Sequence, residues 1–186
     1  MNDTLALSSP SSPALGARPP VRLLVVDDHP VVRSGIMGML GSAADVEVVG
    51  QAADGAAAVE LAGELAPDVV LMDLRMPGLD GVEATRRILA APAPPRVVVL
   101  TTYDTDGDIL PAVEAGAIGY LLKDSPREDI LAAVRAAAAG RSALSPTVTT
   151  RLVGAARASG RDPGAEAPVT LSPREREVLA AVSRGR

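Results

Sequence analysis

Residues 69–78 read Val-Val-Leu-Met-Asp-Leu-Arg-Met-Pro-Gly, and this stretch decides the fold. Four apolar residues run without a break into one carboxylate, Asp73, and a Pro-Gly turn follows at 77–78. An apolar run of this length between turn signals is typical of a strand buried on both faces. Asp73 would then lie at the carboxyl end of that strand, where open α/β sheets present reactive groups. An aspartate at a strand end can equally cap a loop or face water, so the neighbouring strands decide its meaning.

Similar strands alternate with helices on both sides of this stretch. The pattern predicts strands over 21–26, 46–51, 68–72, 96–100 and 119–122, and helices over 31–40, 55–66, 81–90, 107–115 and 126–139. Ser125, Pro126 and Glu128 match a capping box with proline in the first helical turn, which predicts where the last of these helices begins. Five strands that alternate with five helices predict an α/β fold with a doubly wound parallel sheet covered on both faces.

The composition excludes several classes of protein. The chain has 186 residues, 47% of them apolar, with two Tyr, no Phe, no Trp and no Cys. A disulfide framework or a thiolate metal site is therefore impossible, and stacking of a flavin on aromatic rings is disfavoured. No apolar run approaches the roughly 18 residues of a membrane span, and residues 1–20 do not resemble a signal peptide. We therefore expect a soluble cytoplasmic protein with no membrane partner.

The charge is divided unevenly along the chain. Residues 21–140 carry 18 acidic and 9 basic side chains, whereas residues 141–186 carry 8 arginines and 4 acids. We expect a disordered lead-in over 1–20, an acidic domain over 21–140, a linker over 141–170 and a further helix within 171–186. The basic end could bind nucleic acid, although a solvated Arg-rich linker explains it as well.

Chemically active side chains follow four of the predicted strands. The first strand ends in Asp27 and Asp28, the third in Asp73, the fourth in Thr101 and the fifth in Lys123. If the first and third strands are neighbours, a crevice forms between their carboxyl ends. Three converging carboxylates repel one another, and a hard divalent cation with oxygen ligands, such as Mg²⁺, relieves that repulsion.

This set of groups suits a carboxylate that attacks a phosphorus atom. A cation, the ammonium of Lys123 and the hydroxyl of Thr101 would stabilise the phosphoryl oxygens. Lys123 is the only lysine beside 17 arginines, which favours a specific need for a compact ammonium at this position. Chance can also leave a single lysine anywhere in a chain.

Four motifs in the same order resemble the receiver domain of two-component response regulators. They are VVDDHP at 25–30, VLMDLRMPGLDG at 70–81, LTT at 100–102 and GYLLKD at 119–124. The resemblance covers about Val21 to Gly140 and implies a flavodoxin-like receiver with strand order 2-1-3-4-5. The stretches GAIGYLLKD and LSPREREVLAAVSRG resemble the NarL/FixJ subfamily, in which a LuxR-type helix-turn-helix domain follows the receiver.

The resemblance implies roles for the acidic residues. Asp73 resembles the phosphoacceptor, which takes a phosphoryl group from a sensor histidine kinase. Asp28, Asp73 and the backbone carbonyl of Arg75 resemble the direct ligands of Mg²⁺, and Asp27 would hold the ion through water. The protein is then a phosphoacceptor regulator, with at most slow autodephosphorylation, and not an enzyme.

The resemblance also implies a switch. Thr101 resembles the switch hydroxyl, Lys123 the lysine that pairs with phosphate, and Tyr120 the aromatic residue that turns inward on activation. A half-buried strand tyrosine with no switching role would fit the same position. His29, the only histidine, belongs to the subfamily's DDHP pattern, and we expect it to help start the helix that follows.

The carboxyl end departs from the family pattern. A LuxR-type domain needs about four helices, and its recognition helix comes third. The chain reaches only the first of them, over 171–186, so we expect a truncated domain and no residue in this chain that reads DNA. Activation is expected to form a homodimer, and transcription would be controlled through the missing part of the helix-turn-helix domain.

Two other functions compete with this interpretation. A phosphatase of the haloacid-dehalogenase type would place an aspartate two residues after its nucleophile, where this chain has Arg75. A flavodoxin-like cofactor carrier would need a glycine- or hydroxyl-rich phosphate loop after the first strand. Asp27 and Asp28 stand there instead, and their charge would repel a phosphate.

Overall fold

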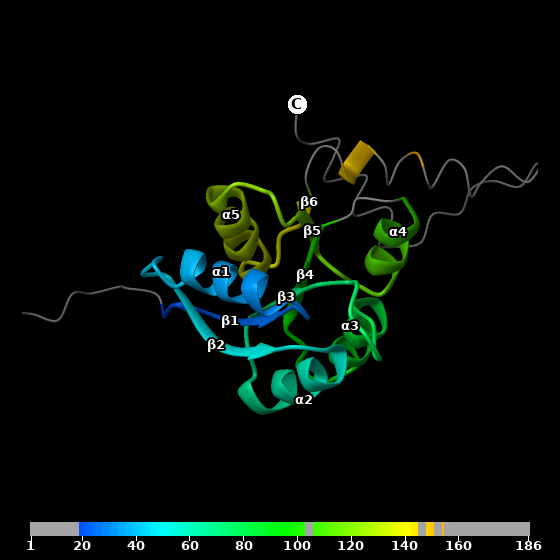
Figure 1. The fold of residues 1–186 in the computed structure, drawn as a ribbon, viewed down its shortest axis with the longest axis horizontal. Coiled ribbons are helices and arrows are strands. Elements are labelled where there is room, and N and C mark those ends of the chain that lie inside the picture. Colours follow the sequence, from blue (N-terminus) through cyan, green and yellow to red (C-terminus); the bar gives the residue numbers. More distant parts are fainter. Residues whose placement is uncertain (1–18, 103–105, 145–147, 151–153, 155–186) are drawn as a thin grey trace, which may run out of the picture.

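The computed structural model describes residues 19–102, 106–144, 148–150 and 154, which form a single parallel sheet flanked by helices (Figure 1). The strands lie in the order β2-β1-β3-β4-β5-β6. They are β1 (Val21–Val26), β2 (Val46–Ala52), β3 (Val69–Met72), β4 (Arg96–Thr101), β5 (Gly119–Leu122) and β6 (Ala143–Leu144). The helices are α1 (Pro30–Leu40), α2 (Gly55–Leu65), α3 (Gly81–Leu89), α4 (Asp106–Glu114) and α5 (Arg127–Ala138). The predicted α/β fold and the order 2-1-3-4-5 are confirmed.

The central strand is β3, as its unbroken apolar run predicts. All four of its residues are buried, and it pairs in parallel with β1 on one side and β4 on the other. Met72 lies opposite Val26 of β1 and Val99 of β4, so β1 and β3 end at the same level and β4 ends two residues further on, at Thr101. The residues that follow these strands therefore meet at one edge of the sheet.

Helices cover both faces of the sheet (Figure 1). On one face α1 and α5 bury Ile36, Leu40, Ile130 and Val134 against the strands. On the other face α2 and α3 form a second apolar cluster, and α4 forms a third around Tyr120. Branched aliphatic and alanine side chains fill almost all of this core, as the lack of aromatic residues requires. No helix in the described part of the chain is long and apolar enough to cross a bilayer.

The helix starts follow local signals in three places and depart from them in one. Pro30 is the first residue of α1, and the Asp54 and Asp80 carboxylates accept backbone hydrogen bonds of 2.8 Å each at the starts of α2 and α3. The predicted capping box at the start of α5 is wrong. The helix begins at Arg127, and Pro126 occupies the capping position with no side-chain hydrogen bond.

The sheet has one strand more than predicted. The short strand β6 pairs in parallel with β5, with Ala143 opposite Gly119 and Leu144 opposite Tyr120. Two residues expected to lie in a linker therefore belong to the sheet. Residues 148–150 and 154, within the expected linker, are helical. Residues 1–18 of the lead-in, residues 145–147, 151–153 and 155–170 of the linker, and the helix within 171–186 lie outside the described residues.

Two glycines hold the loop that follows Asp73 in place. A Cβ atom added to Gly81 would lie 2.0 Å from the Asp73 carbonyl oxygen, and one added to Gly55 would lie 2.3 Å from the Leu79 carbonyl oxygen. Gly81 also donates its N–H to the Leu74 carbonyl at 3.0 Å. The first residues of α2 and α3 therefore pack directly on the backbone of this loop, which only glycine permits.

We predict that Gly81→Ala destabilises the fold by roughly 1–3 kcal/mol, because the new methyl group must displace the backbone at Asp73. Urea unfolding followed by circular dichroism measures this. Gly38→Ala in α1 is the matched control, since no atom lies within 4 Å of its added Cβ. The control should gain about 0.5–1 kcal/mol, and equal stability of the two variants would contradict the proposed packing.

Candidate functional site

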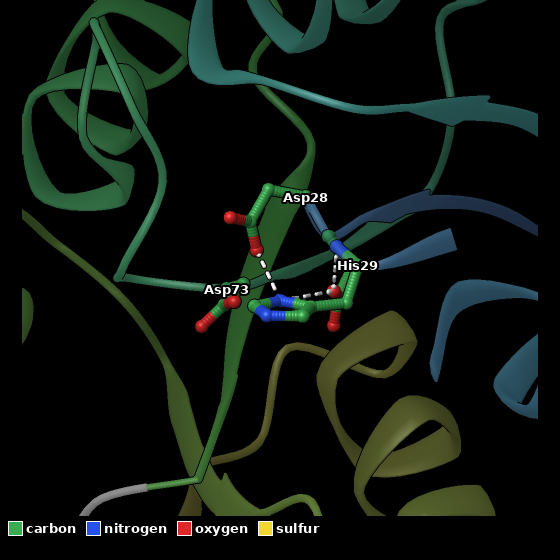
Figure 2. Close-up of side chains that lie close together, drawn as sticks. Asp28, His29 and Asp73 are labelled. Atoms are coloured by element: carbon green, nitrogen blue, oxygen red, sulfur yellow. Dashed lines mark hydrogen bonds and ion pairs between the residues drawn. The ribbon is translucent and has the colours of Figure 1, made fainter. Parts of the chain in front are cut away.

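Three carboxylates meet at the carboxyl ends of β1 and β3. Asp27 and Asp28 directly follow β1, and Asp73 directly follows β3 with its N–H bonded to the Val26 carbonyl at 3.0 Å. One oxygen of each acid and one ring nitrogen of His29 all lie within 4.8 Å of one another. Figure 2 shows Asp28 and His29 on one side of this cluster and Asp73 on the other. The acids that the strand pattern predicted to converge therefore do so.

Lys123 forms ion pairs with the acids that follow β1 and β3. Its Nζ lies 2.6 Å from Oδ2 of Asp27 and 2.7 Å from Oδ2 of Asp73. All three side chains are withdrawn from water, with exposures of 8% for Lys123, 1% for Asp27 and 3% for Asp73. One ammonium group thus neutralises part of the charge of two buried carboxylates, which could not remain ionised together without a counter-charge.

The electrostatics of the pocket follow from burial and from this pairing. Burial raises the pKa of Asp73 above its ordinary value, and the nearby Asp27 charge adds to the effect, although bonds from Lys123 and from the Arg75 amide oppose it. Burial alone would lower the pKa of Lys123, but its contacts with Asp27 and Asp73 outweigh burial and raise it. Lys123 therefore stays charged at neutral pH, and Asp73 is a more basic carboxylate than an exposed aspartate.

The two oxygens of Asp27 have different surroundings. Its Oδ1 accepts the backbone N–H of His29 at 2.8 Å. Its Oδ2 is buried, and its contact among the described residues is the ion pair of 2.6 Å with the Lys123 ammonium. Such an oxygen, beside two further carboxylates, fits a hard divalent cation that prefers oxygen ligands. The donor set is thus suitable for Mg²⁺, held by Asp27, Asp28 and Asp73.

His29 contributes more to the pocket than its sequence pattern predicts. As expected, it lies at the start of α1, where its carbonyl accepts the N–H of Arg33 at 3.0 Å. Its ring nitrogen Nδ1 also lies 2.6 Å from Oδ1 of Asp28 and 3.8 Å from Oδ1 of Asp27 (Figure 2). The Asp28 side chain, 22% exposed, therefore has a direct partner in the residue that follows it. The only available signal was the position of the histidine directly after the acidic pair.

The remaining predicted residues lie at or next to this pocket. Thr101 is the last residue of β4 and is buried, and its carbonyl accepts the N–H of Lys123 at 2.8 Å. The Arg75 amide donates to Oδ1 of Asp73 at 3.3 Å, while a metal-binding role for the Arg75 carbonyl stays a prediction. Tyr120 lies on β5 and is fully buried against α4, and is not half-exposed.

The comparisons with known proteins agree on one family. Residues 23–135 match the family described as response regulator receiver domain. Over 166 residues the chain is 42% identical to the transcriptional regulatory protein LiaR of Bacillus subtilis, covering 89% of this chain and 78% of that protein. It is 39% identical to the nitrate/nitrite response regulator NarL of Escherichia coli K12, covering 89% and 76%. The solved receiver domain of the putative response regulator NarL from Mycobacterium tuberculosis is 43% identical with a TM-score of 0.64, covering 67% of this chain and all of that one.

We predict that Lys123→Met lowers the free energy of unfolding by about 3–5 kcal/mol without divalent cations, because two buried carboxylates lose their counter-charge. Millimolar Mg²⁺ should recover more stability in this variant than in the wild type, since it supplies the missing positive charge. Urea unfolding with and without Mg²⁺ measures both effects.

The matched control for this prediction is Arg135→Met. It breaks an exposed ion pair of 2.6 Å with Asp45 far from the pocket. We expect a much smaller loss of stability there, with no response to Mg²⁺ beyond that of the wild type. Equal losses in the two variants would contradict a special role for the buried pair.

Proposed function

This chain belongs to the response regulator receiver family, and from that membership we propose that Asp73 accepts a phosphoryl group from a sensor histidine kinase. The observation that carries the proposal is the cluster of Asp27, Asp28 and Asp73 with Lys123 bonded to the acceptor. The protein is a phosphoacceptor regulator and not a catalytic enzyme. The kinase supplies the phosphohistidine, and this chain supplies the nucleophile and its surroundings.

The chemical step requires an ionised and accessible Asp73 oxygen. One Asp73 oxygen forms a bond to phosphorus while the bond from phosphorus to the kinase imidazole breaks, and the imidazole keeps the electron pair of that bond. The raised pKa of Asp73 makes its carboxylate more nucleophilic, and Lys123 keeps it ionised. A Mg²⁺ ion held by Asp27, Asp28, Asp73 and the Arg75 carbonyl would offset the repulsion between these acids and the incoming phosphoryl group.

The new phosphoryl group changes the contacts of the pocket. It adds nearly two negative charges and three acceptor oxygens at Asp73. Lys123 and Thr101, whose backbones are already bonded to each other, follow neighbouring strands and can turn toward these oxygens. Complete switching of a two-state protein needs about 5.5 kcal/mol, whereas one hydrogen bond to a charged group contributes roughly 1.5–3 kcal/mol. Two such contacts together with dimerisation are sufficient.

In the proposed switch, β5 and α4 transmit the effect of phosphorylation away from the pocket. Tyr120 lies three residues before Lys123 and packs in one cluster with Ile109 and Ala112 of α4. Val148, which follows β6, is 1% exposed and belongs to the same cluster. A change in the packing of Tyr120 therefore reaches the segment that leads out of the receiver domain.

The output we propose is control of transcription. The relatives with high identity are named as transcriptional regulatory proteins or response regulators. Residues 171–186 resemble the start of a LuxR-type helix-turn-helix domain, and the preceding basic segment follows the receiver directly. Binding of DNA would take place through that domain, in a homodimer that phosphorylation favours.

We predict that Asp73→Asn abolishes phosphorylation by acetyl phosphate in the presence of Mg²⁺, because the amide is a far weaker nucleophile. Intact-protein mass spectrometry detects the added phosphoryl group, and hydroxylamine should release it from the wild type. Asp124→Asn, an exposed acid next to Lys123, is the matched control and should be labelled like the wild type. Undiminished labelling of Asp73→Asn at another residue would refute the assignment of the acceptor.

A second prediction separates the switch from the acceptor. Thr101→Ala should be labelled normally, but its phosphorylation should strengthen dimerisation about tenfold less than in the wild type. The reason is the loss of one charge-assisted hydrogen bond of roughly 1.5–3 kcal/mol, where 1.4 kcal/mol corresponds to tenfold. Sedimentation velocity over a concentration series measures the dimer. Thr102→Ala, an exposed neighbour, should behave like the wild type, and identical dimerisation of both variants would exclude Thr101 as the switch.

A further inference from the structure

The side chain of Arg33 turns back from α1 onto the end of β1. Its Nη1 donates to the carbonyl oxygen of Asp27 at 2.5 Å, and its Nε donates to the side-chain carbonyl of Gln51 in β2 at 3.0 Å. Arg33 is partly buried, whereas Gln51 is exposed. One guanidinium group thus joins the loop that carries the acidic pair to the neighbouring strand.

The carbonyl that Arg33 binds is the first one on this strand beyond the sheet. The Val26 carbonyl still accepts the N–H of Asp73 at 3.0 Å, and the Asp27 N–H still bonds to the Ala52 carbonyl at 3.1 Å. Beyond these two bonds the backbone that follows β1 no longer pairs with β2 or β3. The orientation of the peptide between Asp27 and Asp28 is therefore held by a side chain instead of by a strand.

This peptide matters because it sets the direction of the Asp28 side chain. Asp27 is held independently, by the His29 amide on one oxygen and by Lys123 beside the other. Within the described part of the chain Asp28 has no such buried support: its partner is the ring of His29, which is itself 68% exposed. The position of the Asp28 carboxylate therefore depends more on its backbone than that of Asp27 does.

We propose that Arg33 is a positioning residue of the metal site, which orients the Asp27–Asp28 peptide so that Asp28 faces Asp73. The inference rests on the proposed function, because it concerns the same acidic pocket. Arg33 touches neither phosphorus nor metal in this role; it acts through the backbone of the acids. Partners that orient metal ligands in this way typically change metal affinity about 10–100-fold when they are removed.

A purely structural role of Arg33 makes a different prediction. If Arg33 served only to tie α1 to β2, removal of Gln51 would break the same tie and have the same effect. If it acts through the Asp27 carbonyl, Gln51 is dispensable and a single donor at position 33 suffices. Arg33→Lys keeps one donor on a long stem, and Arg33→Met keeps the stem without a donor.

Isothermal titration of Mg²⁺ into the full chain, with urea unfolding in parallel, tests this. We expect Arg33→Met to bind Mg²⁺ about 10–100-fold more weakly than the wild type. Arg33→Lys should recover most of the affinity, and Gln51→Ala should stay within about twofold of the wild type, since its hydrogen bond is exposed. Should Arg33→Met not fold, Arg33→Leu takes its place, because leucine also has no hydrogen-bond donor in its side chain.

Each outcome decides one question. Unchanged affinity in the folded donor-free variant would overturn the positioning role, and so would an equal loss in Gln51→Ala or a failure of Arg33→Lys to recover affinity. A wild type that binds Mg²⁺ and is phosphorylated on Asp73 while the donor-free Arg33 variant matches it would overturn this inference alone. A wild type that neither binds Mg²⁺ nor accepts phosphate would overturn the proposed function, and the inference with it.

Discussion

One buried ammonium group, the Nζ of Lys123, holds the pocket together. It lies within 2.7 Å of carboxylate oxygens that follow two other strands, so the ends of β1, β3 and β5 share one counter-charge. In the interior of a protein such a pairing is costly to form and more costly to break, because either partner alone would be a buried charge. The strand order makes the pairing possible, since β3 lies between β1 and β4 and all of these strands run in the same direction. The chemistry of the site thus depends on a sheet that ends evenly.

The positions of the acids at the ends of β1 and β3 depend in turn on close packing around the loops that carry them. Gly81 and Gly55 allow two helices to start against the backbone of the loop after Asp73, so this loop has little freedom to move away from the pocket. On the other side, Arg33 bonds to the loop that carries Asp27 and Asp28. Asp73 is therefore held by packing, and the acidic pair Asp27 and Asp28 by hydrogen bonds. The binding of a small cation and a phosphoryl group that we propose for this site would benefit from both kinds of restraint, because neither ligand can bridge widely separated acids.

Much of this arrangement could be predicted from the chain, and the reason is visible in particular residues. The run 69–72 ends in Asp73 and has no polar interruption, so both the strand and the position of its acid could be read from it. Asp54 and Asp80 act as helix caps because capping is a local property. The strand β6 could not be predicted, since two residues carry no periodicity and pair only because β5 leaves an edge there. The bonds of Arg33 and the ring contact of His29 could not be predicted either, because they depend on side-chain directions that spacing does not determine. The start of α5 shows the opposite error. The motif Ser-Pro-Arg-Glu predicted a capping box, but the helix has no side-chain hydrogen bond at its capping position.

The same geometry explains how a structural change at the pocket can be transmitted to other parts of the domain. The backbone N–H of Lys123 bonds to the Thr101 carbonyl, so the two groups expected to meet a phosphoryl group are joined where β4 and β5 end. Tyr120 pairs with Leu144 of β6, and its side chain packs with α4 and with Val148. A strand of only four residues, Gly119–Leu122, thus connects the pocket to the chain beyond the receiver domain. Because a packed core does not deform continuously, the switch that we propose would transmit a shift of Lys123 or Thr101 as repacking around Tyr120, and the first segment to respond would be the one that contains Val148.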